Sequence, residues 1–171
     1  MHLFLIGYRG TGKTTLGRTV AARLGLPFVD LDEKIAKATR KSIPEIFSKE
    51  GEGKFRDYES LELKKACTDG KQVISCGGGI ITREENISLM KKEGLVVLLT
   101  APAKVIYSRI YFDKNRPALT EKDPLEEIKF MLEKRKEAYQ KAKDAEIDTS
   151  TGTVKQRAGE IAKLYREASK I

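Results

Sequence analysis

The chain has 171 residues, 40% of them hydrophobic and 34% charged, and a formal net charge of +8. This balance is typical of a soluble globular protein of one domain with a sizeable core, and no apolar run is long enough to span a membrane. The first apolar run is too short for a signal peptide, and neither the single histidine nor the spacing of Cys67 and Cys76 suggests a metal or redox site, so we expect a cytoplasmic protein.

The first predicted strand, His2–Ile6, leads directly into a complete G-x-x-x-x-G-K-T phosphate loop at Gly7–Thr14. A helix predicted from Lys13 to Leu24 follows, with Gly25 as its C-terminal cap. The loop N–H groups and the helix dipole would hold phosphate oxygens, with Lys13 on the β- and γ-phosphates. The predicted nucleotide-binding residues of this segment are Gly10, Thr11, Gly12, Lys13, Thr14 and Thr15.

The class of phosphate-loop protein depends on where the acidic residues lie. The chain has no Asn/Thr-Lys-x-Asp guanine motif, and the strands predicted at Gln72–Cys76 and Leu95–Thr100 do not end in a carboxylate, as they would in motor or transporter ATPases. The strand predicted at Pro27–Leu31 supplies Asp30 and Asp32 instead. Residues two apart in a strand share a face, so one carboxylate would serve Mg²⁺ and the other an acceptor hydroxyl.

Asp32 also has a simpler interpretation, as the N-cap of a helix over residues 33–38, with Asp30 a solvated strand end. Farther along the chain, residues 32–70 are predicted to be helical and residues 111–123 to form a mobile loop. The remaining predicted features are a capping box at Thr82–Glu85, a helix from Asp123-Pro124 to about Lys143, a strand at Ala145–Asp148 and a helix at Val154–Ser169.

Short, nearly continuous apolar strands alternate with helices along the whole chain. This alternation predicts an α/β fold, a three-layer sandwich in which helices cover both faces of a parallel sheet. The active site of such a fold lies beyond the carboxyl ends of the strands.

Several motifs together resemble those of the shikimate kinase family. The matching segments are Gly7–Thr15, Asp30–Asp32, Ile43–Phe47, Gly51–Glu59, Gly77–Gly79, Arg116-Pro117 and Arg135 with Tyr139. The Phe-Arg-x-x-Glu sequence, the triple glycine and the Arg-Pro pair are much more specific in this order than the phosphate loop. The resemblance implies one nucleoside-monophosphate-kinase-like domain over residues 1–171, with a five-stranded parallel sheet, a helical substrate-binding insert at about 32–70 and a lid at about 111–123.

The implied reaction is transfer of the γ-phosphoryl group of MgATP to the 3-hydroxyl of shikimate, in aromatic amino-acid biosynthesis. By resemblance, Asp32 binds the ring hydroxyls and is the general base, while Asp30 and Thr14 lie near Mg²⁺. The implied substrate-binding residues are Asp32, Arg56, Gly77, Gly78, Gly79 and Arg135. Judged from the residues alone, Arg56 could equally form a surface ion pair with Asp57 or Glu59, and Arg135 could be one more solvated cation.

The resemblance also assigns Arg116 to the transferring phosphate, as a lid residue, and Arg109 to the adenine ring. Without it, Arg116 would be a solvated loop cation. The family usually has leucine after Arg-Pro, where this chain has Ala118, so the packing of the lid is expected to differ. Phe47 and Phe55 are candidates for the pocket wall, or for the core.

Two other functions are also compatible with a phosphate loop in a basic chain. A related phosphate-loop kinase acting on gluconate or a nucleotide is disfavoured by the Asp30/Asp32 pair and by Phe55-Arg56, which suit a carboxylated polyol. A nucleotide-dependent nucleic-acid binder would use the net charge of +8, but basic and acidic residues alternate along the predicted helices, which is typical of solvated faces. We therefore expect a monomer whose partners are ATP and shikimate, with no nucleic acid and no membrane.

Overall fold

The computed structural model describes residues 1–111 and 123–170. Within these ranges, five parallel strands form one sheet in the order β2-β3-β1-β4-β5. The strands are β1 (His2–Ile6), β2 (Phe28–Asp30), β3 (Val73–Ser75), β4 (Gly94–Thr100) and β5 (Ala145–Asp148). Central β1 is buried along its whole length, and its Phe4 lies opposite Ile74 of β3 and Val96 of β4. The predicted five-stranded parallel α/β fold is therefore confirmed.

Helices connect the strands, and most of them begin and end close to the residues that the sequence predicted. They are α1 (Lys13–Leu24), α2 (Leu31–Thr39), α3 (Ile43–Thr68), α4 (Glu84–Glu93), α5 (Ala103–Ile110), α6 (Pro124–Ala142) and α7 (Val154–Ala168), with a 3₁₀ turn, η1, at Ile80–Thr82. Gly25 ends α1 in the left-handed conformation, and the Asp123 carboxylate accepts a hydrogen bond from Leu125 N at the start of α6. Inside α3, Gly51 has a φ of 82° and kinks the helix.

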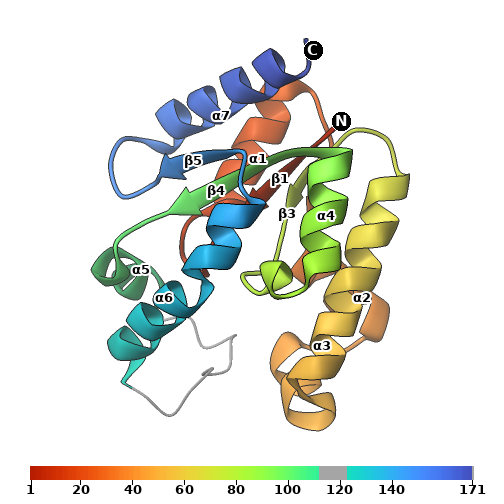
Figure 1. Ribbon diagram of the computed structural model, residues 1–171, viewed down its shortest axis with the longest axis vertical. Helices are drawn as coiled ribbons and strands as arrows, with labels where there is room; N and C mark the ends of the chain where they lie inside the picture. Colours follow the sequence, from red (N-terminus) through yellow and green to blue (C-terminus); the bar gives the residue numbers. More distant parts are fainter. Residues whose placement is uncertain (112–122, 171) are drawn as a thin grey trace.

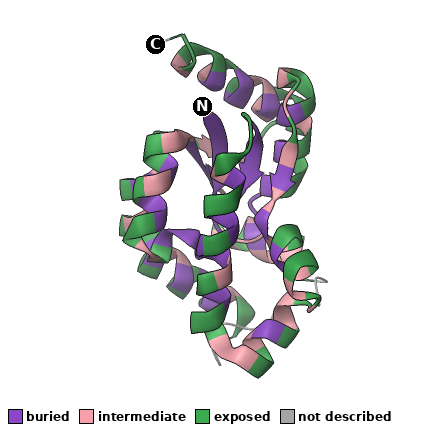
Figure 2. Ribbon diagram, turned by 90° about the vertical axis from the view of Figure 1, so that its right-hand side faces the viewer, coloured by how far each residue is buried: buried purple, intermediate pink, exposed green. Residues whose placement is uncertain are grey.

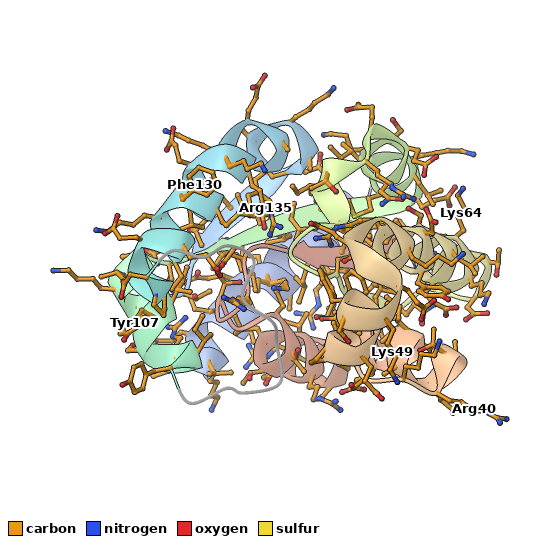
Figure 3. All side chains as sticks on the ribbon, turned by 90° about the horizontal axis from the view of Figure 1, so that it is seen from below. Arg40, Lys49, Lys64, Tyr107, Phe130 and Arg135 are labelled. Atoms are coloured by element: carbon orange, nitrogen blue, oxygen red, sulfur yellow. The ribbon has the colours of Figure 1, made fainter. Side chains whose placement is uncertain are left out.

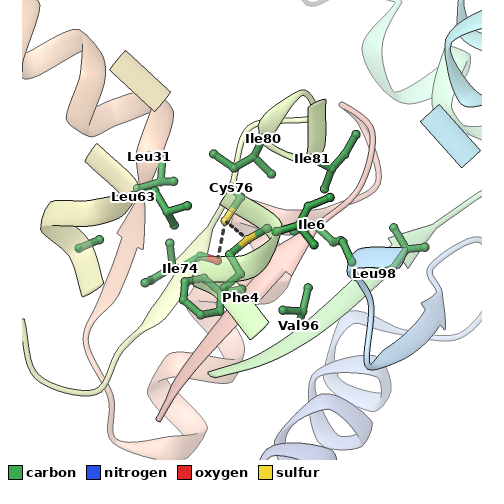
Figure 4. Close-up of a cluster of buried hydrophobic side chains, with 14 of the residues drawn as sticks. Phe4, Ile6, Leu31, Leu63, Ile74, Cys76, Ile80, Ile81, Val96 and Leu98 are labelled. Carbon is green, nitrogen blue, oxygen red and sulfur yellow. Dashed lines mark hydrogen bonds between the residues drawn. The ribbon is translucent and has the colours of Figure 1, made fainter. Parts of the chain in front are cut away.

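The helices form a layer on each face of the sheet (Figure 1). On one face, Leu3 and Leu5 of β1 pack with Leu16 of α1 and Ile161 of α7. On the other face lies a larger cluster contributed by the strands, α3, α4, α6 and η1, part of which is drawn in Figure 4. Figure 2 shows the buried residues along the inner faces of both layers. The parallel arrangement brings the carboxyl ends of all the strands to one edge, where the site is expected.

Two local predictions were wrong. The second strand ends at Asp30, and Leu31 already begins α2, because the Asp30 carboxylate caps that helix by accepting from the N–H groups of Asp32 and Glu33. The capping box at Thr82 does not form: Thr82 ends the 3₁₀ turn, and its hydroxyl donates to Gly79 O at 2.7 Å. The residue before α4 is instead Arg83, which makes no side-chain capping bond.

The predicted mobile loop at 111–123 lies almost entirely outside the described residues. None of the helices within residues 1–111 and 123–170 has both the length and the apolar character needed to cross a membrane.

Candidate functional site

The phosphate loop connects the end of β1 to the first turn of α1. Gly10 and Gly12 have φ values of 79° and 93°, which non-glycine residues rarely adopt. A Cβ atom at Gly10 would also lie 2.6 Å from the Ile110 side chain. Lys13 is buried, and its ammonium group donates to the carbonyl oxygens of Gly7 and Tyr8 at 2.8 and 3.0 Å. The loop therefore curls around its lysine at a helix N-terminus, the arrangement that binds phosphate anions.

Asp30 and Asp32 both lie beside this loop, but not by the geometry that the sequence predicted. Asp30 ends β2, and its Oδ2 accepts a hydrogen bond of 2.8 Å from the Thr14 hydroxyl while Oδ1 caps α2. Asp32 lies in the first turn of α2. The two carboxylates thus do not alternate along one strand. They still line one cavity with the phosphate loop, because the N-terminus of α2 turns Asp32 toward it.

We call this cavity the loop cavity. Its lining residues are Arg9, Gly10, Gly12, Lys13, Thr14, Thr15, Asp30, Asp32, Ser75, Cys76 and Ile110. A second cavity, the α3 cavity, adjoins it and shares Arg9 and Asp32 with it. Its lining residues are Tyr8, Arg9, Asp32, Ile43, Phe47, Phe55, Arg56, Glu59, Gly77, Gly78, Gly79 and Arg135. Every residue that the sequence assigned to substrate binding is therefore found in the α3 cavity.

Arg56 is 8% exposed and belongs to α3. Its guanidinium group donates to Glu59 Oε2 at 2.5 Å and to Glu52 Oε1 at 2.7 Å. The alternative of a surface ion pair with Glu59 is thus half right: the pair exists, but Glu59 is buried and the arginine faces a cavity. The guanidinium group is therefore held by an ion-pair network at the wall of the α3 cavity.

Burial raises the pKa of Glu59 to about 7, against the opposing attraction of Arg56; the nearby charge of Asp32 raises it further and that of Arg135 lowers it. The second carboxylate oxygen, Oε1, is buried and makes no hydrogen bond. Glu59 thus holds Arg56 in place with one oxygen, and its carboxyl group is partly protonated near neutral pH.

Arg135 comes from α6, on the other side of the α3 cavity. It is 6% exposed, so it is not a solvated cation. Its Nη1 donates to Gly78 O at 3.1 Å, and the Tyr139 hydroxyl donates to the same oxygen at 2.7 Å. In Figure 3, Arg135 lies toward the middle of the molecule, whereas Arg40 projects outward at the edge.

The three glycines after β3 have a packing reason that the sequence did not show. A Cβ atom at Gly77 would lie 2.1 Å from Glu59 Oε1, and one at Gly79 would lie 2.2 Å from the guanidinium carbon of Arg56. Gly77 and Gly79 therefore leave room for the buried ion pair. Gly78 lies between the two halves of the site, where a Cβ atom would be 3.5 Å from Arg135 Nη1 and 3.6 Å from Arg9 N.

Arg109 closes a third cavity on the far side of the phosphate loop. It extends from the last turn of α5 and donates to Gly10 O at 3.2 Å and to Thr149 O at 2.6 Å. The Thr149 hydroxyl in turn donates to Thr11 O at 2.9 Å. The other residues that line this cavity are Gly12, Thr15, Leu16, Gly152, Thr153, Val154 and Arg157. Arg109 and the 149–153 loop thus meet beside the phosphate loop.

With this geometry described, comparisons with known proteins are informative. A family model described as shikimate kinase matches residues 9–166. A shikimate kinase from Thermodesulfovibrio yellowstonii is 45% identical to the chain over 168 residues, which cover 98% of the chain and 96% of the relative. The chain belongs to the shikimate kinase family.

Solved structures agree with this membership. The shikimate kinase from Acinetobacter baumannii in complex with shikimate superposes with a TM-score of 0.92 at 36% identity, covering 98% of this chain and 93% of that one. A gluconokinase from Sinorhizobium meliloti 1021 reaches a TM-score of only 0.59 at 15% identity, covering 99% and 95%. The second similarity shows a shared fold alone.

From the sequence, no site role was assigned to four of the residues that line the α3 cavity: Tyr8, Arg9, Ile43 and Glu59. Glu59 could have been assigned, because an arginine and a glutamate three apart on a helix form ion pairs. Tyr8 and Arg9 occupy positions that the phosphate-loop motif leaves undefined, and Ile43 has no distinctive pattern. Arg116, which the sequence assigned to the transferring phosphate, lies outside the described residues, as does Ala118.

Proposed function

We propose that the chain transfers the γ-phosphoryl group of MgATP to the 3-hydroxyl of shikimate, in the chorismate pathway of aromatic amino-acid biosynthesis. Family membership supports the reaction. The observation that carries it to this chain is that two buried arginines, Arg56 and Arg135, converge with Asp32 on a cavity that adjoins the phosphate loop. Two guanidinium groups can bind the carboxylate of a ligand, and the Asp32 carboxylate can accept hydrogen bonds from the hydroxyl groups of a polyol.

The donor half of the site is the phosphate loop. We assign ATP phosphates to the N–H groups of Gly10–Thr15 and to Lys13, and the adenine ring to the cavity beside Arg109. In support, the loop geometry and the helix N-terminus provide a preformed anion site, and Arg109 is fixed by Gly10 and Thr149 beside it.

Thr14 and Asp30 are the proposed residues for Mg²⁺. Their oxygen atoms already meet at 2.8 Å, and hydroxyl and carboxylate oxygens are the ligands that this ion prefers. When bound, Mg²⁺ neutralises charge on the β- and γ-phosphates.

In the acceptor half, Arg56 and Arg135 bind the carboxylate of shikimate, Gly77, Gly78 and Gly79 lie along its ring, and Asp32 binds its hydroxyls. Phe47 and Phe55, whose rings lie 4.8 Å apart, form the apolar wall. Asp32 accepts the proton of the 3-hydroxyl as the oxygen attacks. Because phosphoryl transfer depends mainly on positioning and charge stabilisation, even a weak base suffices.

Three finer parts of the proposal rest on the sequence. Arg116 would contact the transferring phosphate from a lid at about 111–123, which would close over an insert at about 32–70. The protein would act as a cytoplasmic monomer with small-molecule partners only. A gluconate or nucleotide kinase is the second candidate within the same fold. The α3 cavity is lined by two arginines and by an apolar wall, which would bind a carboxylated ring better than either of those substrates.

Shikimate binding to the wild-type chain and to Arg56→Lys tests this assignment. Calorimetric titration should show that Arg56→Lys weakens binding about tenfold or more, since a lost charge-assisted hydrogen bond costs about 1.5–3 kcal/mol. The methyl ester of shikimate should bind wild type equally poorly, because it lacks the charge. Arg40→Lys, on the exposed end of α2, is the matched control.

Equal affinities for wild type and Arg56→Lys would remove Arg56 from the carboxylate site. A wild-type chain that binds the ester as well as the acid would contradict carboxylate recognition altogether.

A further inference from the structure

Only two side chains line both the loop cavity and the α3 cavity, among the described residues: Asp32 and Arg9. On the proposed function, the phosphoryl group must cross between these two cavities, from ATP to the acceptor hydroxyl. Asp32 already has a role there as the acceptor's proton partner. Arg9 is a cation at the same boundary, and neither the motif nor the resemblance assigns it a role.

Arg9 is held at this boundary by a specific partner. Its Nη2 donates to Glu127 Oε1 at 2.7 Å, and the Glu127 side chain is only 2% exposed, while that of Arg9 is 18% exposed. The pair joins the phosphate loop to α6 across 118 residues of sequence. The guanidinium carbon also lies 5.7 Å from the centre of the Tyr8 ring.

The backbone of Arg9 is close to the acceptor side as well. A Cβ atom at Gly78 would lie 3.6 Å from Arg9 N, so residue 9 directly faces the glycine turn that lines the α3 cavity. A buried anion bonded to a guanidinium group fixes the orientation of that group. A guanidinium group has five N–H donors and stays charged at all working pH values.

We propose that Arg9 contacts the oxygens of the transferring phosphoryl group, and that Glu127 is the positioning residue that orients it. In the step, the bond between the γ-phosphorus and the bridging oxygen breaks, and its electron pair stays on ADP. The acceptor hydroxyl oxygen bonds to the phosphorus, and its proton passes to the Asp32 carboxylate. Charge on the three equatorial oxygens is what Arg9 stabilises.

The competing explanation is purely structural: the Arg9–Glu127 pair merely fastens the phosphate loop to α6. The two explanations differ in what the partners contribute. A fastener depends equally on both residues, so removing either one has the same effect. A phosphoryl contact depends on Arg9 itself, so Glu127→Gln, which leaves the arginine in place, has the smaller effect.

The test compares Arg9→Met, Arg9→Lys, Glu127→Gln and the control Arg166→Met on the exposed face of α7. Steady-state assays with shikimate and ATP should show kcat about 10²–10³-fold lower for Arg9→Met, as for loss of other charge-stabilising donors. The KM values for both substrates should stay within about threefold, because the contact forms in the transition state. Arg9→Lys should fall in between, because it keeps the charge and loses the planar fork.

A second readout uses MgADP, shikimate and aluminium fluoride, which mimics the planar transferring phosphoryl group. Arg9→Met should lose the tight trapping of ADP by this mixture but keep wild-type affinity for MgADP alone. If thermal unfolding shows that Arg9→Met does not fold, the kcat of Arg9→Lys is compared with that of Glu127→Gln instead. A larger loss in Arg9→Lys supports the phosphoryl contact, and an equal loss supports the fastener.

Equal losses of kcat in Arg9→Met and Glu127→Gln, or unchanged trapping in Arg9→Met, would overturn the phosphoryl contact in favour of the fastener. An active wild type with a fully active Arg9→Met would overturn it while leaving the proposed function intact. A wild-type chain that does not phosphorylate shikimate would instead refute the proposed function on which this inference rests.

Discussion

Glu59 shows how a single buried carboxyl group can adjust a binding site. Its side chain is nearly inaccessible, it pairs with Arg56, and burial raises its pKa to about 7. Near neutral pH it therefore exists in both protonation states. If Arg56 binds the substrate carboxylate as proposed, charged Glu59 would compete for the arginine, and neutral Glu59 would leave its full positive charge to the ligand.

The raised pKa has a consequence for stability. The folded chain holds the Glu59 proton more tightly than the unfolded chain, whose pKa is near 4.5, so this stabilisation is complete below about pH 4.5 and is lost as the pH rises through about 7. Glu59→Gln removes the titration. From pH 4.5 to 7.5, the free energy of unfolding of wild type should fall relative to that of the variant by at most about 3 kcal/mol.

Denaturant unfolding across this pH range measures the effect. Glu45→Gln is a control that should show little change over this range, because hydrogen bonds from Ser42 lower the pKa of Glu45 from 4.5, so the stabilisation it provides is lost only at lower pH. A difference between wild type and Glu59→Gln that does not change with pH would show that Glu59 is ionised throughout.

At the same scale, single residues were the least predictable part of the site. Arg56 and Arg135 stand among other charged residues in sequence, and only their positions on the inner sides of α3 and α6 bury them. The resemblance supplied both assignments, whereas the local sequence left open a surface ion pair for Arg56 and a solvated cation for Arg135. Arg9 was missed entirely, because a phosphate-loop motif leaves its central positions open.

At the scale of elements, α1 connects the phosphate loop to the sheet through a close contact. A Cβ atom at Gly17 would lie 2.4 Å from the Phe28 ring and 3.2 Å from Leu5. Gly17→Ala should therefore destabilise the chain by about 1–3 kcal/mol, as overpacked cores do, in spite of the better helix propensity of alanine. Gly53→Ala in α3, where a Cβ atom meets nothing within 4 Å, should stabilise it by up to about 1 kcal/mol.

Chemical denaturation of both variants checks this pair of predictions. If Gly17→Ala were as stable as Gly53→Ala, the contact between α1 and β2 would be looser than the structure shows.

Elements were also what the sequence predicted best, with informative exceptions. All five strands occur where the apolar runs placed them, α6 begins at its predicted Asp123 cap, and α7 begins at the predicted Val154. The errors came from side chains that can cap more than one element. Asp30 caps α2 and so ends β2 early, and Thr82 bonds back to Gly79 rather than forward into α4.

At the scale of the whole molecule, the site exists only because the sheet order places distant segments together. Arg135 Nη1 bonds to Gly78 O across 57 residues of sequence, and Arg9 bonds to Glu127 across 118. Alternating strands and helices predicted a parallel sheet, but the order β2-β3-β1-β4-β5 does not follow from periodicity. The family resemblance implied five parallel strands but not their order, and the comparisons confirmed the family.

The central claim, a kinase specific for shikimate, is tested most directly by initial rates of ADP formation with MgATP and a panel of acceptors. Asp32→Asn, purified in the same way, measures the background from host kinases, since it should bind ATP nearly normally and lack the proton acceptor. We predict rapid turnover with shikimate, and rates no higher than this background with gluconate and nucleoside monophosphates. Turnover with shikimate no faster than that of Asp32→Asn would contradict the account.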